Sequence, residues 1–474
     1  MSDLRNRRAG ISWPAMAFMT IAATGSIAQL SASAEYGLGA VTLYLLPALC
    51  FLLPVALIAA ELATGWEGGV FTWVREGMSD RMGFQAQWLQ WIQSVALYPS
   101  LLSFAAAALA YAFGDAGLAT NGLYTGAVIL VVFWLATLVA MRGVSTTARI
   151  ASTGMIVGTA IPAVALVVLM AIWLGDGHTS NTPLAASDVV PPWTGLSGIV
   201  LIISNFIAFA GLEVNAVHVR DMNEPERGYP KALALAGAAI VAMYMLGSIA
   251  IAVMVPNGAI NLNAGAAQAF TVFGTTFGVP WLGQVLSAML VIGILAAATS
   301  WVAGPSRGLL NVGREGFLPP SLQRVNDNGV QAPILIVQGL IVSLLAMAFV
   351  FIPSVASAFW ILQATTAILY LSMYVILFVA AWRLRRVRPD TPRTFRVPAI
   401  GLFATVGVLA AASAIFIAFI PPAQFGDAPV ALYVGILLAG VLVLGLAGQL
   451  IVQFKKPGWQ ENLPEIEDSL EFEL

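Results

Sequence analysis

Charge is what this sequence has least of. Only 9% of its 474 residues are Asp, Glu, Lys or Arg, whereas soluble domains carry about 25% charged residues. Hydrophobic residues make up 59% of the chain. This shortage of charge excludes a soluble globular protein and predicts a polytopic membrane protein.

Cysteine and histidine are also scarce. The single cysteine, Cys50, lies inside an apolar run, so disulfides do not organise the fold and a cysteine-based metal site is excluded. The two histidines leave little for acid–base chemistry, and the chain has no P-loop, zinc-binding His pair or cluster of catalytic carboxylates. We therefore expect a protein that is not an enzyme and that needs no metal and no cofactor.

Long apolar runs are what the sequence does have. A bilayer core needs roughly 20 apolar residues per helix, and by this measure the chain is an all-α protein of twelve transmembrane helices. The predicted spans cover residues 13–34, 38–62, 86–113, 122–141, 150–174, 196–219, 232–255, 281–310, 333–352, 355–381, 400–421 and 430–452.

The cations lie on one side of these spans. If the N-terminus is cytoplasmic, all 21 Lys and Arg residues fall in cytoplasmic tails and loops or at their membrane edges, and none falls in an outer loop. This is the positive-inside pattern. It predicts a multi-pass protein of the cell inner (cytoplasmic) membrane with both termini cytoplasmic.

The sixth span carries the first sign of a functional site. It thins to the small residues Ala210 and Gly211 and then places Glu213 at what should be mid-membrane depth. An ionisable side chain inside an apolar span is costly and marks a functional site by default. A Gly-interrupted helix at that depth is tolerated only where the freed backbone is buried in protein or lines a cavity. Together these features predict a substrate site.

The first span has a matching feature, the small and polar stretch TGS at Thr24–Ser26. Taken alone, it suits either close helix packing or an unwound segment whose N–H groups receive an anionic ligand group. Two Gly-interrupted segments five spans apart favour the second interpretation, because they are typical of transporters built from inverted repeats. The start of the chain also resembles a signal peptide, with SASA before Glu35 as a cleavage site, but the repeat requires this segment as its first helix.

The repeat divides the chain into five parts. We expect a five-plus-five inverted repeat with broken first and sixth helices, followed by two additional helices. The parts are a cytoplasmic N-terminal tail (1–12), a first repeat (13–174), a second repeat (196–382), two additional spans (400–452) and a short acidic cytoplasmic tail (453–474).

Four stretches of the sequence resemble the amino acid–polyamine–organocation superfamily of permeases, and most closely its bacterial glutamate/γ-aminobutyrate antiporter family. They are LPVALIAAELATGWEGGVFTWV (53–74), EVNAVHVRDMNEPERGYPKA (213–232), SWVAGPSRGLLNVGREGFLP (300–319) with NDNGV (326–330), and RPDTPRTFRVP (388–398). They are spread over the ten-span core. The resemblance implies alternating access within the five-plus-five repeat.

The resemblance also implies roles for individual residues. Thr24–Ser26 would receive the substrate's α-carboxylate, and carbonyl groups near Phe209 to Gly211 would accept from its ammonium group. Glu213 would help to form the inner gate. Phe206 and Phe209 are candidates for an aromatic lid, although packing alone would also place an aromatic on one face of this helix. With Tyr98, which points into a cavity or packs as a core aromatic, the predicted substrate-binding residues are Thr24, Gly25, Ser26, Ile27, Tyr98, Phe206, Phe209, Ala210, Gly211 and Glu213.

The chain departs from the family in two places. Ala28 follows Ile27 where the superfamily has the second Gly of a Gly-x-Gly, and the short tail has no histidine and no long C-terminal plug. Acid gating through such a plug is therefore not expected. No Lys or Arg lies deep enough to pair with a substrate's side-chain carboxylate, so glutamate would enter protonated or meet hydroxyl and amide donors. Glu213 is the candidate for proton coupling, because removal from water disfavours the charged form of a carboxyl group.

We therefore expect secondary active transport of amino acids, with exchange of the glutamate/γ-aminobutyrate type as the leading hypothesis. The alternatives are proton-coupled uptake of neutral amino acids or amines, and then a non-transporting substrate sensor or a channel. A channel would need rings of polar residues along a continuous pore, whereas polarity here is focused at two breaks. The expected partners are a small-molecule amino-acid substrate and the lipid bilayer, without nucleic acid, in a monomer or homodimer.

Overall fold

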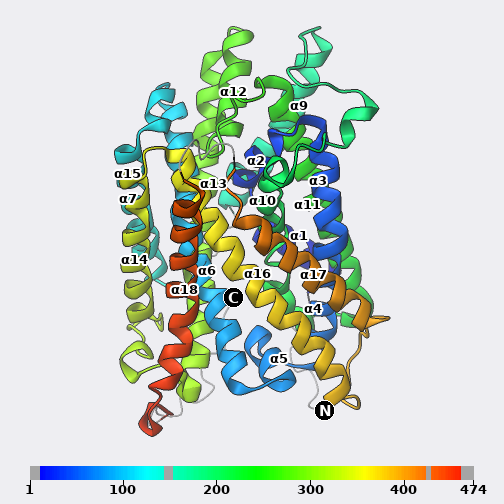
Figure 1. The fold of residues 1–474 in the computed structure, drawn as a ribbon, viewed down its shortest axis with the longest axis vertical. Coiled ribbons are helices and arrows are strands. Elements are labelled where there is room, and N and C mark those ends of the chain that lie inside the picture. The colour runs from blue at the N-terminus through cyan, green and yellow to red at the C-terminus, as the bar shows by residue number, and fades with distance from the viewer. Residues whose placement is uncertain (1–10, 144–152, 423–428, 461–474) are drawn as a thin grey trace, which may run out of the picture.

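The computed structural model describes residues 11–143, 153–422 and 429–460, and within these ranges every regular element is a helix (Figure 1). Eleven helical segments in these ranges are long and apolar enough to cross a membrane. They are Gly37–Gly65, Asp80–Ala112 (α6), Gly122–Ala140 (α7), Thr153–Gly175, Leu196–Val214, Pro225–Met254 (α11), Pro280–Phe317, Ala332–Phe351, Val355–Val387 (α16), Ile400–Ala418 (α17) and Val430–Gln453 (α18). The predicted all-helical membrane fold is confirmed.

Five of these segments are composite. Their main parts are η2 (Gly37–Gly39), α3 (Ala40–Pro47), the π-helical turn η3 (Ala48–Leu52) and α4 (Leu53–Gly65); η5 (Ile156–Ala160) and α9 (Ile161–Gly175); η7 (Leu196–Ile202), α10 (Ile203–Phe209) and the start of η8 (Leu212–Asp221); α13 (Pro280–Val312) and η9 (Gly313–Phe317); and α14 (Ala332–Ala346) and α15 (Ala348–Phe351).

The predicted first span is not among these eleven segments, because its helix is broken. It consists of α1 (Trp13–Thr24), the 3₁₀ turn η1 (Ile27–Gln29) and α2 (Leu30–Ala34). None of these pieces is long enough to cross a bilayer alone, because about 20 helical residues are needed. The prediction of a broken first helix is therefore confirmed.

Two shorter helices lie at opposite ends of the molecule. The helix α5 (Gly69–Gly77) lies at the lower end in Figure 1, and α12 (Gly265–Thr276) lies at the upper end. The stretch that forms α12 was not predicted as a separate helix, because twelve residues are too few to register as a span. The end that carries α5 is the lower end of the molecule, and the end that carries α12 is its upper end.

The long helices differ in how much of their surface is inside the protein. In the most apolar window of α6, 83% of the residues are buried, and the value for α16 is 78%. In α17 and α18 the values are only 28% and 17%. The helix α6 packs on α13 and α16 at the centre of the bundle. The helices α17 and α18 lie at its periphery and present apolar side chains outward.

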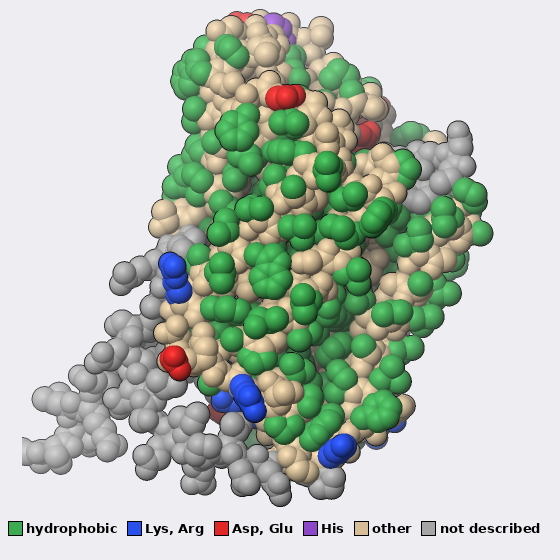
Figure 2. Space-filling model, turned by 90° about the vertical axis from the view of Figure 1, so that its left-hand side faces the viewer, with side chains coloured by type: hydrophobic (Ala, Val, Ile, Leu, Met, Phe, Trp, Pro, Cys, Tyr) green, Lys and Arg blue, Asp and Glu red, His purple; other side chains and the backbone are tan. Residues whose placement is uncertain are grey.

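Cations gather toward the lower end of the molecule. On the face drawn in Figure 2, the Lys and Arg side chains lie in the lower half, and the upper part shows only acidic side chains and a histidine among the charged types. Between them lies a broad band of hydrophobic side chains (Figure 2). This distribution agrees with the positive-inside pattern of the sequence.

An ion cluster holds the lower end together. Glu61 of α4 is buried, and its carboxylate accepts hydrogen bonds from Arg385 of α16, with Nε to Oε1 at 2.7 Å, and from Arg393 at 2.8 Å. The backbone N–H of Val397 donates to the same carboxylate at 2.8 Å. The guanidinium of Arg393 also stacks over the Trp66 ring. The cluster fixes the segment between α16 and α17 against the end of α4.

Candidate substrate site

The first helix break begins where α1 ends at Thr24. Gly25 and Ser26 both have extended backbone conformations, and Gly25 is the C-cap whose N–H donates to the carbonyl of Ile21 at 2.7 Å. Ser26 is the N-cap of η1 and makes no side-chain capping hydrogen bond there. The break therefore brings the carbonyl end of α1 close to the N–H end of η1, as an unwound segment between two half-helices must.

The second helix break lies between α10 and the 3₁₀ helix η8 (Leu212–Asp221). Ala210 is extended, and Gly211 has a φ of 102° in the left-handed region. Only glycine adopts this conformation without strain, which explains why this residue type ends the helix here. The chain then turns so that Glu213 lies in the first turn of η8.

The two breaks meet. A methyl group built on Gly211 would lie 3.4 Å from Cγ2 of Thr24 and 3.7 Å from the Trp301 ring of α13. The hydroxyl of Tyr244, from α11, donates to the carbonyl of Thr24 at 2.8 Å and accepts from the N–H of Ser26 at 3.1 Å. It also lies 3.3 Å from the carbonyl of Ala208 in α10. One tyrosine thus satisfies backbone groups on both sides of the first break and reaches the second.

Glu213 lies just beyond the second break and is almost fully buried. Its Oε1 accepts from the hydroxyl of Tyr370 at 2.9 Å and from the amide of Gln90 at 3.3 Å. Its Oε2 accepts from the hydroxyl of Tyr374, which in turn accepts from the N–H of Gly211 at 2.7 Å. The carboxyl group therefore joins η8 to α6 and to α16, and Tyr374 ties the same cluster to the backbone of the break.

The contacts of Glu213 are all to neutral groups. Two tyrosine hydroxyls and one amide donate to it, and among the described residues no Lys or Arg forms an ion pair with it. Glu61, by contrast, is paired with two arginines. A buried carboxyl group held only by neutral donors accommodates a change of protonation or of partner more readily than one locked in an ion pair.

The other predicted site residues have different surroundings. Ile27 and Ala210 are buried beside their breaks. The ring of Phe206 packs against Phe51 at 5.4 Å, and that of Phe209 packs against both Tyr44 and Tyr244 at 6.1 and 6.0 Å. Both phenylalanines therefore take part in the packing of α10 on neighbouring helices.

Tyr98 lies on α6 eight residues beyond Gln90. Its ring is buried and packs against Phe133 of α7 at 5.1 Å. This contact joins two helices next to each other in sequence and does not connect Tyr98 with either break.

A layer of amide and hydroxyl groups lies on the α2 side of the breaks. The amide nitrogen of Gln363 donates to Oε1 of Gln29 at 2.9 Å, and Oγ of Ser100 donates to Oε1 of Gln363 at 3.1 Å. Ser33 of α2 donates to Oδ1 of Asn205 of α10 at 2.6 Å. All these side chains are buried. They supply neutral hydrogen-bonding groups close to the breaks, with no cation among them.

Five residues around the breaks were missed by sequence reasoning, and all of them come from intact helices. A lone tyrosine or tryptophan in an apolar span is equally compatible with simple packing, so no local signal marks them. The one hint is that Trp301 lies in SWVAGPSR, part of a stretch that carries the resemblance to the permease superfamily. They are Gln90, Tyr244, Trp301, Tyr370 and Tyr374.

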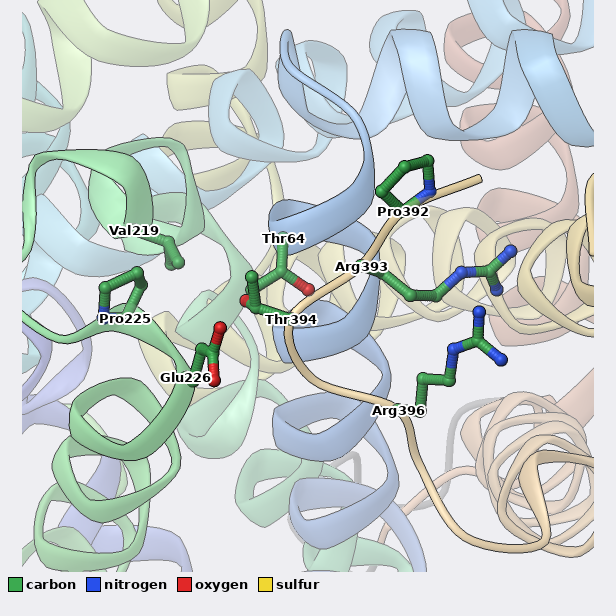
Figure 3. A pocket seen from close by; sticks show the side chains of 8 residues that line it. All are labelled: Thr64, Val219, Pro225, Glu226, Pro392, Arg393, Thr394 and Arg396. Atoms are coloured by element: carbon green, nitrogen blue, oxygen red, sulfur yellow. The ribbon is translucent and has the colours of Figure 1, made fainter. Parts of the chain in front are cut away.

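A pocket of about 570 Å³ opens at the lower end, away from the breaks (Figure 3). It is lined by the end of α4, the junction of η8 with α11, and the segment after α16. In Figure 3, Glu226 faces Thr64 and Thr394. The guanidinium groups of Arg393 and Arg396 lie near each other and point away from Glu226. None of the lining residues belongs to either break, so this pocket is distinct from the candidate substrate site. They are Thr64, Val219, Pro225, Glu226, Pro392, Arg393, Thr394 and Arg396.

Comparisons with known proteins find similarity to permeases, transporters and antiporters. The model of the amino acid permease family matches residues 11–443. An uncharacterised transporter of Legionella pneumophila is 33% identical over 90% of this chain and 93% of its own. A glutamate/gamma-aminobutyrate antiporter of Lactococcus lactis subsp. lactis is 30% identical over 89% and 86% of the two chains. A probable agmatine/putrescine antiporter of the same organism is 26% identical over 73% of each.

Proposed function

Because the chain belongs to the amino acid permease family, we propose that it exchanges amino acids across the cytoplasmic membrane by alternating access. The observation that carries this proposal is the meeting of two helix breaks next to a buried carboxyl group. Such discontinuous helices supply unpaired backbone N–H and carbonyl groups at membrane depth, where substrate and coupling-ion sites of this kind are built.

The two ends of a zwitterionic amino acid match the two breaks. The N–H groups that follow Ser26 suit the α-carboxylate, because the start of a helix favours negative charge. The carbonyl groups around Phe209 to Gly211 suit the ammonium group, because the end of a helix favours positive charge. Thr24, Gly25 and Ile27 complete the first subsite, and Trp301 offers an aromatic surface beside Gly211.

Glu213 is the gate residue of this proposal. Its hydrogen bonds to Tyr370, Tyr374 and Gln90 fix η8 against α16 and α6, which closes the lower side of the breaks. Opening a path to the lower end requires these bonds to break. A proton on the carboxyl group or a rearrangement of the substrate would change the same bonds, so Glu213 is also our candidate for proton coupling.

In this proposal the chain is organised as a five-plus-five inverted repeat. Residues 13–174 form the first half, residues 196–382 form the second half, and residues 400–452 lie outside the repeat. We place the lower end, where the cations gather (Figure 2), in the cytoplasm, and the distribution of Lys and Arg along the sequence puts both termini on the same side. The substrate is a small-molecule amino acid and the surroundings are the lipid bilayer. The protein works as a monomer or a homodimer.

The substrate class follows from the relatives and from the neutral site. One matched antiporter is named for glutamate with γ-aminobutyrate, its decarboxylation product, so we propose exchange of an amino acid for its decarboxylation product. Another is named for two amines, agmatine and putrescine. The neutral layer of Gln29, Gln363 and Ser100 suits a protonated or uncharged side chain. For the same reason, proton-coupled uptake of neutral amino acids or amines is the second candidate function.

Exchange in proteoliposomes tests the proposal. Purified protein is reconstituted with one unlabelled amino acid or amine inside, and uptake of a radiolabelled one is measured from outside. We expect uptake only when a substrate is present on the other side, with glutamate and γ-aminobutyrate as the first pair. A preceding thermal-shift screen of amino acids and amines selects further pairs.

Each outcome of this experiment has a meaning. Uptake without internal substrate but driven by an inward proton gradient supports the second candidate function and rejects exchange. Binding in the thermal-shift screen without any counterflow identifies a non-transporting sensor. Flux that does not saturate with substrate concentration identifies a channel.

A further inference from the structure

An apolar groove of about 510 Å³ runs between α3 and α11 on the outer surface of the helix bundle. Its floor is low because small residues, Gly237, Ala238 and Ala242 on α11 and Ala48 on η3, stand where larger side chains would fill the space. Leucine, valine, isoleucine and methionine side chains form its walls, and they are Leu45, Val241, Met245, Leu246 and Ile249. The lining carries almost no polar surface.

Two cations lie on the same face of α11 as this groove. Arg227 and Lys231 are exposed at the start of the helix. Ala238, Ala242 and Met245 follow them at spacings of three, four or seven residues, which place all five side chains on one face of an α-helix. Neither cation forms an ion pair with any residue that the structure describes. Two exposed cations, next to the exposed Glu224 and Glu226, therefore precede an open apolar channel on one face of α11.

The dimensions of this line match one leaflet of a bilayer. Lys231 and Met245 are separated by fourteen residues of α11, which is about 21 Å along a helix. A leaflet with its headgroup region is half of roughly 40–45 Å. A helix placed with Gly237 to Met245 among the acyl chains therefore has Arg227 and Lys231 at the level of the lipid headgroups.

We propose that this face of α11 is a binding site for an anionic phospholipid of the leaflet at the lower end, with its phosphate on Arg227 and Lys231 and one acyl chain in the groove. Basic side chains at the membrane surface attract anionic headgroups, and an acyl chain fills a dry channel that offers nothing to a polar ligand. A second copy of the chain would bring two further cations to the same place, because its symmetric surface repeats Arg227 and Lys231.

The site adjoins the substrate site through α11 itself. Other faces of this helix carry Tyr244, which holds the two breaks, and Met243, whose Cε lies 3.3 Å from a methyl group built on Gly25. A lipid chain in the groove fills the space between α11 and α3, so it supports the helix that positions both breaks.

Native mass spectrometry of the purified full chain tests this proposal with two defined probes, dioleoylphosphatidylglycerol and dioleoylphosphatidylcholine. We expect the anionic lipid to bind more tightly than the zwitterionic one. Arg227→Gln and Lys231→Gln should each weaken phosphatidylglycerol binding by about fivefold, because a basic residue at the membrane surface contributes about 1 kcal/mol of attraction. Lys456→Gln, at an exposed cation beyond α18, is the matched control and should leave binding unchanged.

Filling the groove provides the second test. Ala238→Phe combined with Ala242→Phe should abolish the tightly held phosphatidylglycerol, whereas Ala412→Phe, at an exposed alanine of α17, should not. Both positions face outward, so thermal unfolding in detergent should stay near that of the wild type and establish that each variant is folded. Equal binding of the two lipids, or unchanged binding in the Arg227, Lys231 and groove variants, overturns the proposal. A groove variant that changes the oligomeric state while lipid binding stays the same assigns this face to a second copy and also overturns it.

Discussion

At the scale of single residues, the protein holds two buried glutamates in opposite ways. Glu61 is fixed by two arginines and a backbone N–H, whereas the side chains that donate to Glu213 within the described ranges are two tyrosines and a glutamine. Removing one partner from a buried ion pair is strongly destabilising, while neutral hydrogen bonds exchange at lower cost. The first arrangement suits permanent structure, and the second suits a gate.

Glu213→Gln should impair exchange without unfolding the protein. Glutamine keeps the size of the side chain. In the wild type a tyrosine hydroxyl donates to each carboxylate oxygen, and in the variant an N–H₂ group, which cannot accept, replaces one of these oxygens. Hydrogen bonds to a charged group are worth about 1.5–3 kcal/mol, so we expect at least a roughly tenfold loss of exchange or a loss of its pH dependence. Proteoliposome exchange between pH 5 and 8 measures both, with the exposed Glu226→Gln as control. Transport and pH dependence like those of the wild type would remove Glu213 from the mechanism.

Tyr374→Phe should affect both the gate and the second break. Its hydroxyl accepts from the N–H of Gly211 and donates to Glu213, and its loss leaves a buried backbone N–H without this partner, at a cost of about 1–3 kcal/mol. We expect slower exchange and a lower unfolding temperature. Tyr124→Phe, which removes a hydroxyl that donates to the carbonyl of Ala106 on α6, is the control. A Tyr374 variant no more affected than the Tyr124 variant would contradict the assigned role.

At the scale of elements, the site depends on an intact helix that supports two broken ones. The helix α11 runs without interruption from Pro225 to Met254, and its Tyr244 reaches the backbone at Thr24, Ser26 and Ala208. Backbone groups released at a break need partners inside a membrane, because water is not there to supply them. The tyrosine provides these partners for both breaks and so keeps them side by side.

Tyr244→Phe should weaken substrate binding more than it lowers stability. A neutral hydrogen bond contributes about 0.5–1.5 kcal/mol, so we expect about a two- to tenfold rise in the substrate concentration needed for half-maximal exchange. Tyr229→Phe is a matched control, because Tyr229 is a buried tyrosine of the same helix whose hydroxyl has no partner among the described residues. Equal half-saturation constants for both variants would show that Tyr244 does not position the breaks for the substrate.

At the scale of the whole molecule, a buried ion cluster joins segments far apart in the sequence. Arg393 and Glu61 are separated by 332 residues, and both side chains are almost completely buried. The nearby pair of Arg388 and Glu76 is much more exposed. Exposed pairs contribute about 0–1 kcal/mol, so only the buried cluster should matter to the stability of the fold.

Arg393→Ala should lower the free energy of unfolding by about 3–5 kcal/mol, which is typical when one partner of a buried ion pair is removed. Thermal unfolding of the detergent-purified variants by fluorescence measures the change, with Arg388→Ala as control. The control should stay within about 1 kcal/mol of the wild type. Equal effects of the two substitutions would mean that burial of the cluster is not what holds the lower end.

The orientation of the whole chain is testable with introduced cysteines, because only the native Cys50 has to be removed first. In a Cys50→Ser background, Ser187→Cys lies in the upper connection and Asp327→Cys in a lower loop, and both positions are on the surface. A membrane-impermeant maleimide should label the Ser187 variant in intact cells and the Asp327 variant only after permeabilisation, because cations favour the cytoplasmic side. The reverse labelling would place the lower end outside the cell.

The membrane class, the positions of the spans and the two breaks could all be predicted from the amino-acid sequence. These features are local: a span depends on about 20 consecutive apolar residues, and a break such as that at Gly211 depends on a residue that tolerates a positive φ. Glu213 could be identified in the same way, because a carboxylate in an apolar run is costly and is kept mainly where it serves a function.

The surroundings of those features depend on the tertiary structure. Tyr370 and Tyr374 lie more than 150 residues from Glu213, Tyr244 lies 220 residues from Thr24, and Glu61 meets its arginines from the opposite end of the chain. A tyrosine in an apolar helix has the same local pattern whether it packs, as Tyr98 does on Phe133, or completes a site. Partners of this kind are chosen by the packing of whole helices, and no short stretch of sequence contains that information.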